Sequence, residues 1–417
     1  MKKIRFIALL LVLLSLLVVI PTTFAFDNDT IVSSDANSVI LSDDYYFDAN
    51  LSSDTGDGSI SNPYKELTSD RIQDNSVIHM LNGEYSLDYS KTVRNVTIIG
   101  QDAQNTIIRS NGLTLTVSTS FTLQNVTLMN LRINSDCDFN AANVIFRDSS
   151  STNGGAVSAL SSSNLYFDNA TFINDTASNG GAIYQMSGNL TIINSRFIDC
   201  NATLNGGAIY AQNNNLEING TDFSNNQATG EAGGSIYLFD SYFNSYSLSI
   251  SDCQAPFGGA IAALKTDVNL NNFTARGNKA KYRGGAVYSI YNSFSINGSI
   301  IESNQALNGG GLFINLAYGF YSYNNDFTNN DLGAVYVISE DMECENNTFL
   351  NNEEYLRDIP SLSIGDGNYS LLKSDFNDIS DIPSRYDLRD LGQVSSVKAQ
   401  GSGGNCWSFA ALSALES

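Results

Sequence analysis

Short runs in which apolar and polar residues alternate recur along the middle of the chain. Such alternation is typical of half-buried β-strands, whose successive side chains point to opposite faces. The clearest runs are Leu190-Thr191-Ile192, Leu216-Glu217-Ile218, Leu248-Ser249-Ile250, Val268-Asn269-Leu270 and Phe294-Ser295-Ile296. The segments between them are rich in Asn, Gly and Ser and hold no run of helix formers. The pattern predicts many short strands joined by turns.

A phrase of the form GGAIY recurs together with these strands. Its copies begin at Gly154, Gly180, Gly206, Gly233, Gly258, Gly284, Gly309 and, in a degenerate form, Leu332. The steps between these positions are 26, 26, 27, 25, 26, 25 and 23 residues, and a fixed period of this size indicates a solenoid. A leucine-rich repeat has a similar period, but its L-x-x-L-x-L-x-x-N phrase is absent.

A second recurring pattern is F-x-x-N, as in Phe223 to Asn226 and Phe327 to Asn330. Its last position is held by Asp175, Cys200, Asn226, Cys253, Asn278, Asn304, Asn330 and Asn352. Stacked coils place equivalent residues roughly 4.8 Å apart, so side-chain amides at one bend can hydrogen-bond along the stack. The glycine pair allows a tight corner that a residue with a Cβ would resist.

We therefore expect an all-β chain dominated by a parallel β-helix over residues 46–355. Its buried column should contain Ile183, Ile209, Ile236, Ile261, Val287 and Val335. The next position in the repeat is mostly aromatic: Tyr184, Tyr210, Tyr237, Tyr288, Phe313 and Tyr336. Because successive strand residues alternate, these rings should point outward, where they either stack on one another or bind a sugar or a partner.

The repeats also resemble those of known proteins. The GGAI and F-x-x-N phrases resemble the repeats of bacterial polymorphic outer-membrane proteins, and the whole region looks like the adhesin-like surface proteins of methanogenic archaea. Residues 54–58, DTGDG, followed by Asn62-Pro63-Tyr64, resemble the opening of right-handed β-helices of the pectin-lyase type. The resemblance implies a right-handed β-helix.

The ends of the chain differ from this region. Residues 1–25 combine Lys2, Lys3 and Arg5 with a long apolar run, the pattern of a secretory signal peptide. Residues 26–45 are expected to form a flexible leader and residues 356–381 an acidic linker. We expect a secreted, cell-surface protein without a membrane span once the signal peptide is removed.

Composition limits the chemistry of the β-helix. The net charge of −22 argues against nucleic acid as a partner. His79 is the single histidine, the pair Asp43-Asp44 is expected outside the coils, and no acidic column is seen to recur with the repeat. The sequence therefore predicts no active site within the β-helix, and no cofactor or metal motif is found. The five cysteines are too scattered for a disulfide framework, and Cys200 and Cys253, two coils apart, lie beyond disulfide reach.

The pattern changes again at Ile382, from which no repeat continues. Phe409, Leu412 and Leu415 recur at helical spacing, which predicts a helix over residues 406–416. Cys406 would begin this helix, where the positive end of the helix dipole favours a thiolate. Gln400 could offer a side-chain N–H to an oxyanion, together with the backbone N–H of Cys406.

This segment resembles the start of the mature domain of papain-like cysteine peptidases. The matching residues are Pro383, Asp387, Arg389, Gly392, Val394, Val397, Lys398, Gln400, Gly401, Cys406, Trp407 and Phe409. The resemblance implies an α+β peptidase domain, of which residues 382–417 are the N-terminal part, with Cys406 as nucleophile and Gln400 as oxyanion donor. Gly403 and Asn405 depart from the family, where a disulfide cysteine and a small residue are usual.

In this family the catalytic His and Asn lie roughly 130–150 residues beyond the cysteine. The sequence has 11 residues after Cys406, so we expect the chain alone to be inactive and to form part of a longer secreted peptidase that acts on peptides or proteins. The alternative is a non-catalytic structural adhesin that binds surface glycans or proteins and carries a decayed peptidase remnant.

Overall fold

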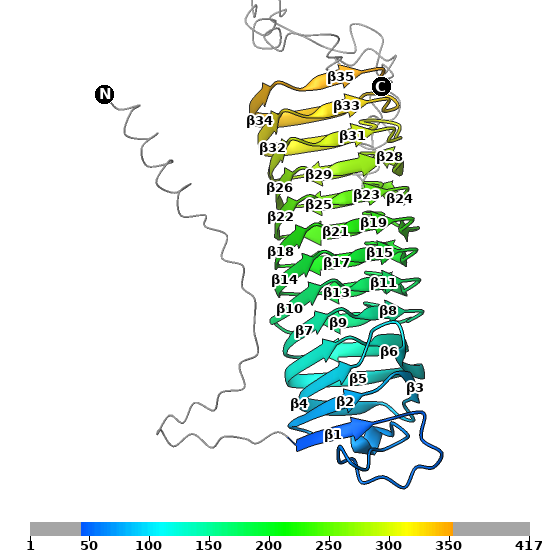
Figure 1. The fold of residues 1–417 in the computed structure, drawn as a ribbon. Helices are drawn as coiled ribbons and strands as arrows, with labels where there is room; N and C mark the ends of the chain where they lie inside the picture. Colours follow the sequence, from blue (N-terminus) through cyan, green and yellow to red (C-terminus); the bar gives the residue numbers. More distant parts are fainter. Residues whose placement is uncertain (1–42, 353–417) are drawn as a thin grey trace, which may run out of the picture. The chain divides into compact units, whose positions relative to one another are not determined.

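The computed structural model describes residues 43–352, which form a stack of coils built from short parallel strands (Figure 1). Each coil pairs with the coil before it and the coil after it. Ile183 pairs with Ile209 and Ile209 with Ile236, so these coils contain 26 and 27 residues. The predicted all-β parallel β-helix is confirmed. Within the described residues the one helical segment is the 3₁₀-helix η1 (Ser69–Arg71), and no helix there has the length and apolar character of a membrane span.

The first coils contain six strands, of which the last three are long, with 10, 19 and 9 residues. The six strands are β1 (Asp43–Phe47), β2 (Ser76–Met80), β3 (Gly83–Ser86), β4 (Lys91–Gly100), β5 (Thr106–Gln124) and β6 (Thr127–Ser135). These are the coils in which the glycine pair is absent from the sequence.

The regular coils align four columns of strands. The first column is β7 (Asp138–Ala142), β10 (Ser163–Asp168), β14 (Gly188–Ile193), β18 (Asn214–Asn219), β22 (Tyr242–Tyr246), β26 (Asp267–Asn271) and β30 (Ser293–Asn297). The second is β8 (Ile145–Arg147), β11 (Thr171–Ile173), β15 (Arg196–Ile198), β19 (Asp222–Ser224), β23 (Ser249–Ser251), β27 (Thr274–Arg276), β31 (Ile300–Glu302), β33 (Asp326–Thr328) and β35 (Thr348–Leu350).

The third column is a separate five-stranded sheet of β12 (Thr176–Asn179), β16 (Asn201–Asn205), β20 (Gln227–Ala228), β24 (Gln254–Phe257) and β28 (Lys279–Arg283). The fourth is β9 (Val157–Ala159), β13 (Ile183–Gln185), β17 (Ile209–Gln212), β21 (Ile236–Phe239), β25 (Ile261–Leu264) and β29 (Val287–Ile290). The long strands β32 (Leu312–Tyr323) and β34 (Val335–Glu345) continue the first and fourth columns together.

The predicted aliphatic column runs along the inside of the fourth column of strands. Ile183, Ile209, Ile236, Ile261 and Val287 pair in succession and are fully buried. Leu312 continues the column, and Val335 pairs with it but is only partly buried. The prediction is confirmed through Val287, and Leu312 fills a place in the column that was not predicted. Val335 is less covered because it lies on β34, close to the end of the described stack.

The F-x-x-N phrase is explained by contacts between coils. The phenylalanines stack inside the second column, with ring centroids 4.5 Å apart for Phe172–Phe197 and for Phe197–Phe223. The amide Nδ2 of Asn226 donates to the carbonyl of Phe197, the equivalent phenylalanine of the preceding coil, at 3.1 Å. The three-residue spacing thus lets one side chain fill the core while the amide caps the coil before it.

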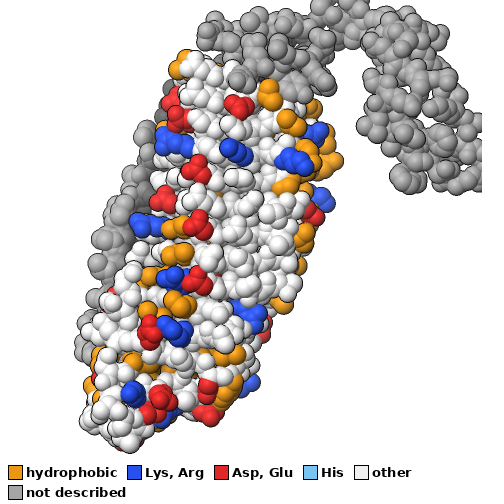
Figure 2. Space-filling view, turned by 90° about the vertical axis from the view of Figure 1, so that its right-hand side faces the viewer, with side chains coloured by type: hydrophobic (Ala, Val, Ile, Leu, Met, Phe, Trp, Pro, Cys, Tyr) orange, Lys and Arg blue, Asp and Glu red, His pale blue; other side chains and the backbone are white. Residues whose placement is uncertain are grey.

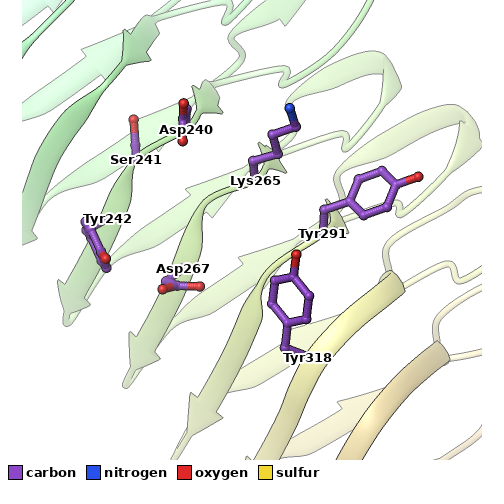
Figure 3. A pocket seen from close by; sticks show the side chains of 7 residues that line it. All are labelled: Asp240, Ser241, Tyr242, Lys265, Asp267, Tyr291 and Tyr318. Carbon is purple, nitrogen blue, oxygen red and sulfur yellow. The ribbon is translucent and has the colours of Figure 1, made fainter.

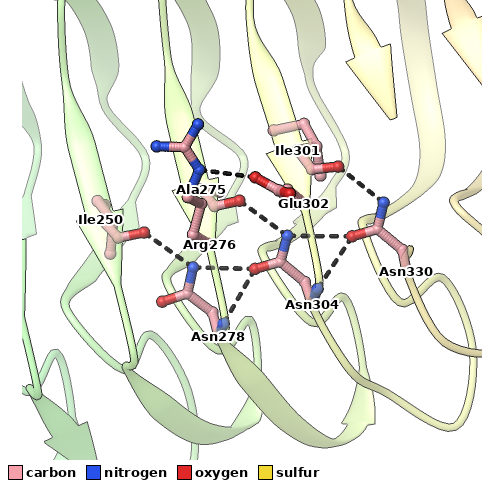
Figure 4. Close-up of polar contacts among 8 residues, drawn as sticks. All are labelled: Ile250, Ala275, Arg276, Asn278, Ile301, Glu302, Asn304 and Asn330. Atoms are coloured by element: carbon pink, nitrogen blue, oxygen red, sulfur yellow. Dashed lines mark hydrogen bonds and ion pairs between the residues drawn. The ribbon is translucent and has the colours of Figure 1, made fainter. Parts of the chain in front are cut away.

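The asparagines also bond to one another (Figure 4). The Asn304 amide donates to Asn330 Oδ1 at 3.1 Å and to the Ala275 carbonyl at 3.0 Å, while the backbone N–H of Asn304 donates to the same Asn330 oxygen. Asn278 repeats this arrangement one coil earlier, on Asn304 and Ile250. The ladder satisfies buried backbone groups at a bend that would otherwise leave them unpaired.

The glycine pair has two causes, of which the sequence predicted the first, a tight corner. The first glycine, such as Gly206, has φ of +64°, which favours glycine. At the second, a Cβ on Gly207 would lie 1.9 Å from the carbonyl oxygen of Gly234 in the next coil. The second glycine is therefore required by the close approach of neighbouring backbones.

The N-terminal end is closed by the segment between β1 and β2. Asp54 accepts hydrogen bonds from the backbone of Lys65 and Glu66 and forms an ion pair with Arg71 at 2.8 Å. The Arg71 guanidinium in turn lies over the ring of Tyr64 at 4.0 Å. These contacts fix a loop whose Leu67 is buried in the first coils, which is how solenoids cover an open end.

The β-helix begins earlier than predicted. Asp43 and Asp44 were expected outside the coils, but they lie on β1, which pairs with β2 from Asp43–Ser76 to Phe47–Met80. Both aspartates are exposed, so they do not carry the alternation that marks the other strands.

The aromatic positions after the aliphatic column form a stacked ladder on the outer face. Ring centroids are 4.8 Å apart for Tyr184–Tyr210 and 5.1 Å for Tyr210–Tyr237. The rings are partly buried by one another, and burial raises the pKa of Tyr210 to about 12. The structure thus shows these rings in the first of their two predicted roles, stacking on one another. Elsewhere on the surface a broad band of backbone and of side chains that are neither charged nor hydrophobic lies beside a column of charged and hydrophobic side chains (Figure 2).

Candidate functional site

The two predicted catalytic residues, Cys406 and Gln400, lie outside the described residues. The chemical groups of residues 43–352 can still be compared with what cysteine peptidase chemistry requires: a thiolate, a histidine close to it and a donor for the oxyanion.

The four cysteines of the β-helix are free, and three of them are buried. Cys253 Sγ lies 3.0 Å from the Ser235 hydroxyl and 3.0 Å from the Ser251 carbonyl, and burial raises its pKa to about 11. Burial likewise raises the pKa of Cys200 well above its usual value. A buried neutral thiol is a poor nucleophile, so these cysteines act as packing residues in the asparagine column.

The remaining thiols have the same character. Burial raises the pKa of Cys344 to about 11, and it also raises the pKa of Cys137. The described part of the chain places no cation beside either thiol that would lower its pKa: the charged groups acting on Cys137 are Asp136 and Asp138, and the one acting on Cys344 is Glu343. No cysteine among the described residues is therefore activated for attack.

The single histidine does not provide the missing base at any of these thiols. His79 lies on β2, its ring stacked on Tyr46 with centroids 4.7 Å apart and its Nε2 3.9 Å from Asp44 Oδ1. Within residues 43–352 no cysteine hydrogen-bonds to it. The Asp44 contact follows from β1 belonging to the coils, which the sequence did not predict.

Acidic residues do form a column that the sequence analysis missed. Asp148, Asp199 and Asp252 occupy the same left-handed turn in alternate coils, with φ of 59°, 55° and 56°. Asn174, in the coil between the first two, donates its amide to Asp148 Oδ1 at 2.9 Å. A search at twice the repeat length would have found them. Because their turn selects residues that tolerate positive φ, we assign them a backbone role. Among the described residues no cluster of three or more His, Cys, Asp or Glu side chains could hold a metal ion.

Comparison with known proteins concerns the other end of the chain. Residues 382–417 match the family model described as papain family cysteine protease. The chain is also similar, over part of its length, to two plant proteins. Ananain of Ananas comosus is 36% identical over 91 residues, which are 21% of this chain and 25% of ananain. The probable cysteine protease RD19C of Arabidopsis thaliana is 54% identical over 37 residues, which are 9% of this chain and 10% of that protein. The chain thus spans about a quarter and a tenth of the lengths of these two relatives.

Proposed function

We propose that this protein is a secreted, cell-surface cysteine peptidase whose papain-like domain begins near Ile382 and is carried by a parallel β-helix. The observation that carries the proposal is the papain-family match over residues 382–417, which contains the ordered motif from Gly392 to Phe409. The four thiols of the β-helix support it indirectly, because packing within the coils accounts for each of them. Cys406 is then the thiol that remains for nucleophilic chemistry.

The proposed reaction is peptide hydrolysis through an acyl-enzyme. The Cys406 thiolate attacks the peptide carbonyl carbon, and the carbonyl oxygen takes up the negative charge. The Gln400 side chain and the Cys406 backbone N–H donate hydrogen bonds to that oxygen. A histidine from the remainder of such a domain would protonate the leaving amine and then activate the water that hydrolyses the thioester.

The proposed location rests on two regions that precede the peptidase segment, the N-terminal residues and the repeats. Residues 1–25 have the charged start and apolar run of a signal peptide. The repeats resemble those of adhesin-like surface proteins, and a net charge of −22 favours a soluble, self-repelling protein outside the cell.

A chimera tests the catalytic part. The segment of ananain that aligns with residues 382–417 would be replaced by these residues, and hydrolysis of a peptide substrate would be measured. We expect activity that Cys406→Ala abolishes and that Gln400→Ala lowers by about 10²–10³. Gln393→Ala, a glutamine of the same segment outside the matched positions, is the control and should leave activity unchanged. A folded chimera without Cys406-dependent hydrolysis would contradict the proposal.

A further inference from the structure

A pocket of about 440 Å³ opens on the outside of the β-helix, at the corner between the fourth and first columns of strands. Its lining is Asp240, Ser241, Tyr242, Lys265, Asp267, Tyr291 and Tyr318 (Figure 3). The volume falls within the range typical of small-molecule sites, roughly 300–1,000 Å³. These residues come from four successive coils, and none of them belongs to the peptidase segment.

The pocket lies where a surface ladder of the repeat stops. In the earlier coils the second residue of each first-column strand is an asparagine, and the amides bond along the stack; these residues are Asn164 on β10, Asn189 on β14 and Asn215 on β18. Asn189 donates to Asn164 at 2.7 Å, and Asn215 donates to Asn189 at 3.0 Å. Tyr242 pairs with Asn215 and Asp267 with Tyr242, so the two positions that follow lack the amide. At these two positions the exposed side chains of Tyr242 and Asp267 take the place of the ladder amides.

The turn beside the pocket contains residues that its backbone disfavours. Lys265 and Tyr291 have φ of 51° and 59°, and the equivalent residue two coils before Lys265 is Asn213, also at 51°. Asparagine tolerates this left-handed conformation, whereas a bulky side chain in it is a genuine outlier. Strained residues are found at functional sites. The same turn in the next coil holds Leu316 at φ of 52°, outside the pocket lining, so a role for the Tyr291 ring in binding has to be tested directly.

The side chains offer flat rings around one carboxylate. Tyr242 and Tyr318 are 61% and 59% exposed, although large aromatic rings are usually covered. Asp267 lies between them in Figure 3. Its Oδ1 accepts the backbone N–H of Ser293 at 2.9 Å, which orients the carboxylate, and within residues 43–352 Oδ2 has no hydrogen bond. A fixed carboxylate oxygen thus lies between two exposed tyrosine side chains.

We propose that this pocket binds a saccharide chain built from neutral or amine-bearing hexoses. A hexose ring has an apolar C–H face that can lie on a tyrosine, and an edge of hydroxyl groups that can donate to Asp267 and Asp240. From Tyr242 to Tyr318 there are three strand spacings, about 14 Å, which is enough for several sugar rings along the β-helix axis. The two carboxylates favour an ammonium group and oppose a uronate, because the single cation of the lining is Lys265.

Calorimetric titration of the full chain tests this with three probes: a glucosamine hexamer, an N-acetylglucosamine hexamer and a galacturonate hexamer. We expect saturable binding of the first two, with the glucosamine hexamer tighter, and none of the third. Tyr242→Ala and Tyr318→Ala should each weaken binding about fivefold or more. Asp267→Asn should weaken binding of the glucosamine hexamer about tenfold.

Matched controls lie on the same column of strands. Tyr166→Ala removes a tyrosine that is 38% exposed, and Asp138→Asn changes an aspartate that bonds to the first amide of the ladder. Both should bind as the unaltered chain does. Binding that the pocket variants do not weaken, binding of the uronate alone, or binding of a lysine-rich peptide in place of both hexose probes would overturn the proposal.

Tyr291→Asn separates a binding role from a packing role. If the tyrosine is kept for the ligand, asparagine in this left-handed turn should raise Tm and weaken hexamer binding at the same time. A Tm that falls would assign the ring to packing and would refute the argument from strain.

Discussion

Position 175 introduces a carboxylic acid into a column otherwise held by amides and thiols. Asp175 is fully buried, and its Oδ1 accepts the backbone N–H of Ser149 at 2.9 Å. Within residues 43–352 its Oδ2 has no hydrogen-bond partner, whereas the asparagines of the column donate from the equivalent atom to the carbonyl of the preceding coil. Burial therefore raises the pKa of Asp175 well above its usual value, and the neutral acid is the form that suits this place.

This gives a pH dependence that can be measured. Because the folded pKa is raised, the stabilising effect of the neutral acid is full below about pH 4, where the unfolded chain also keeps its proton, and is lost as pH rises through the folded pKa. Asp175→Asn should remove this slope and raise the free energy of unfolding at pH 7 by about 1–3 kcal/mol, since its Nδ2 can donate to the carbonyl of Phe146. Urea unfolding at several pH values checks it.

The reciprocal change is the control for Asp175. Asn278→Asp places an acid where an amide now donates to Ile250 at 2.9 Å, so it should create the pH slope that Asp175→Asn removes. Equal pH profiles for the two variants would contradict this account of the column.

The buried thiols allow a second prediction at this scale. Cys200 and Cys253 are completely buried with raised pKa values, so iodoacetamide should label them only after the coils open. Mass spectrometry of the native and the urea-unfolded chain would measure this. Labelling of either residue in the native chain at the rate of an exposed thiol would show that its coil is not closed.

At the scale of the coil, stability depends on how closely neighbouring backbones approach. Gly207→Ala would place a Cβ 1.9 Å from the Gly234 carbonyl and 2.7 Å from the backbone of Gln227. We expect a loss of more than about 3 kcal/mol in the free energy of unfolding, because backbone atoms on both sides cannot move aside.

Gly333→Ala is the matched control, since this glycine has φ of +94° and no atom of the described residues lies within 4 Å of its Cβ position. It should cost only about 1–2 kcal/mol, the conformational part alone. If both substitutions have the same effect on urea unfolding, close approach is not the reason for the second glycine.

Most of this coil could be predicted from the sequence, because identical residues stack on themselves and the period is visible directly. Ile183, Asn304 and Tyr210 lie where the repeat placed them. Features that depend on exposed or non-repeating residues could not be predicted. The first strand was missed because it begins with two exposed aspartates, Asp43 and Asp44, and so lacks the alternation of apolar and polar residues. The pocket was missed because Tyr242 and Tyr318, three coils apart, come together only in the folded chain. The predicted catalytic residues Cys406 and Gln400 lie outside the described residues and stay a prediction.

At the scale of the whole molecule, the chain combines a closed stack of coils with a segment similar to papain-family proteases. The purified 417-residue chain should show no Cys406-dependent peptidase activity on unfolded protein substrates. The reason is that the reaction needs a histidine beside the thiol, and the single histidine, His79, lies on β2, where its ring stacks on Tyr46 and its Nε2 faces Asp44. Comparison with Cys406→Ala and His79→Ala in the same assay measures this. Hydrolysis that both substitutions abolish would place the base in the β-helix and refute the proposed arrangement.

The strands of each regular coil pair with those of the coils next to it, so whole coils can be added to or removed from the β-helix. Each strand of the regular coils bonds to its equivalents one repeat before and one repeat after, and residues 180–205 make up one such unit. An in-frame duplication or loss of that unit would return the chain to the same register and alter the rod by one strand spacing, about 4.8 Å. Gain or loss of whole repeats would therefore change the length of the β-helix in equal steps, while the remaining coils keep the strand pairing between neighbours.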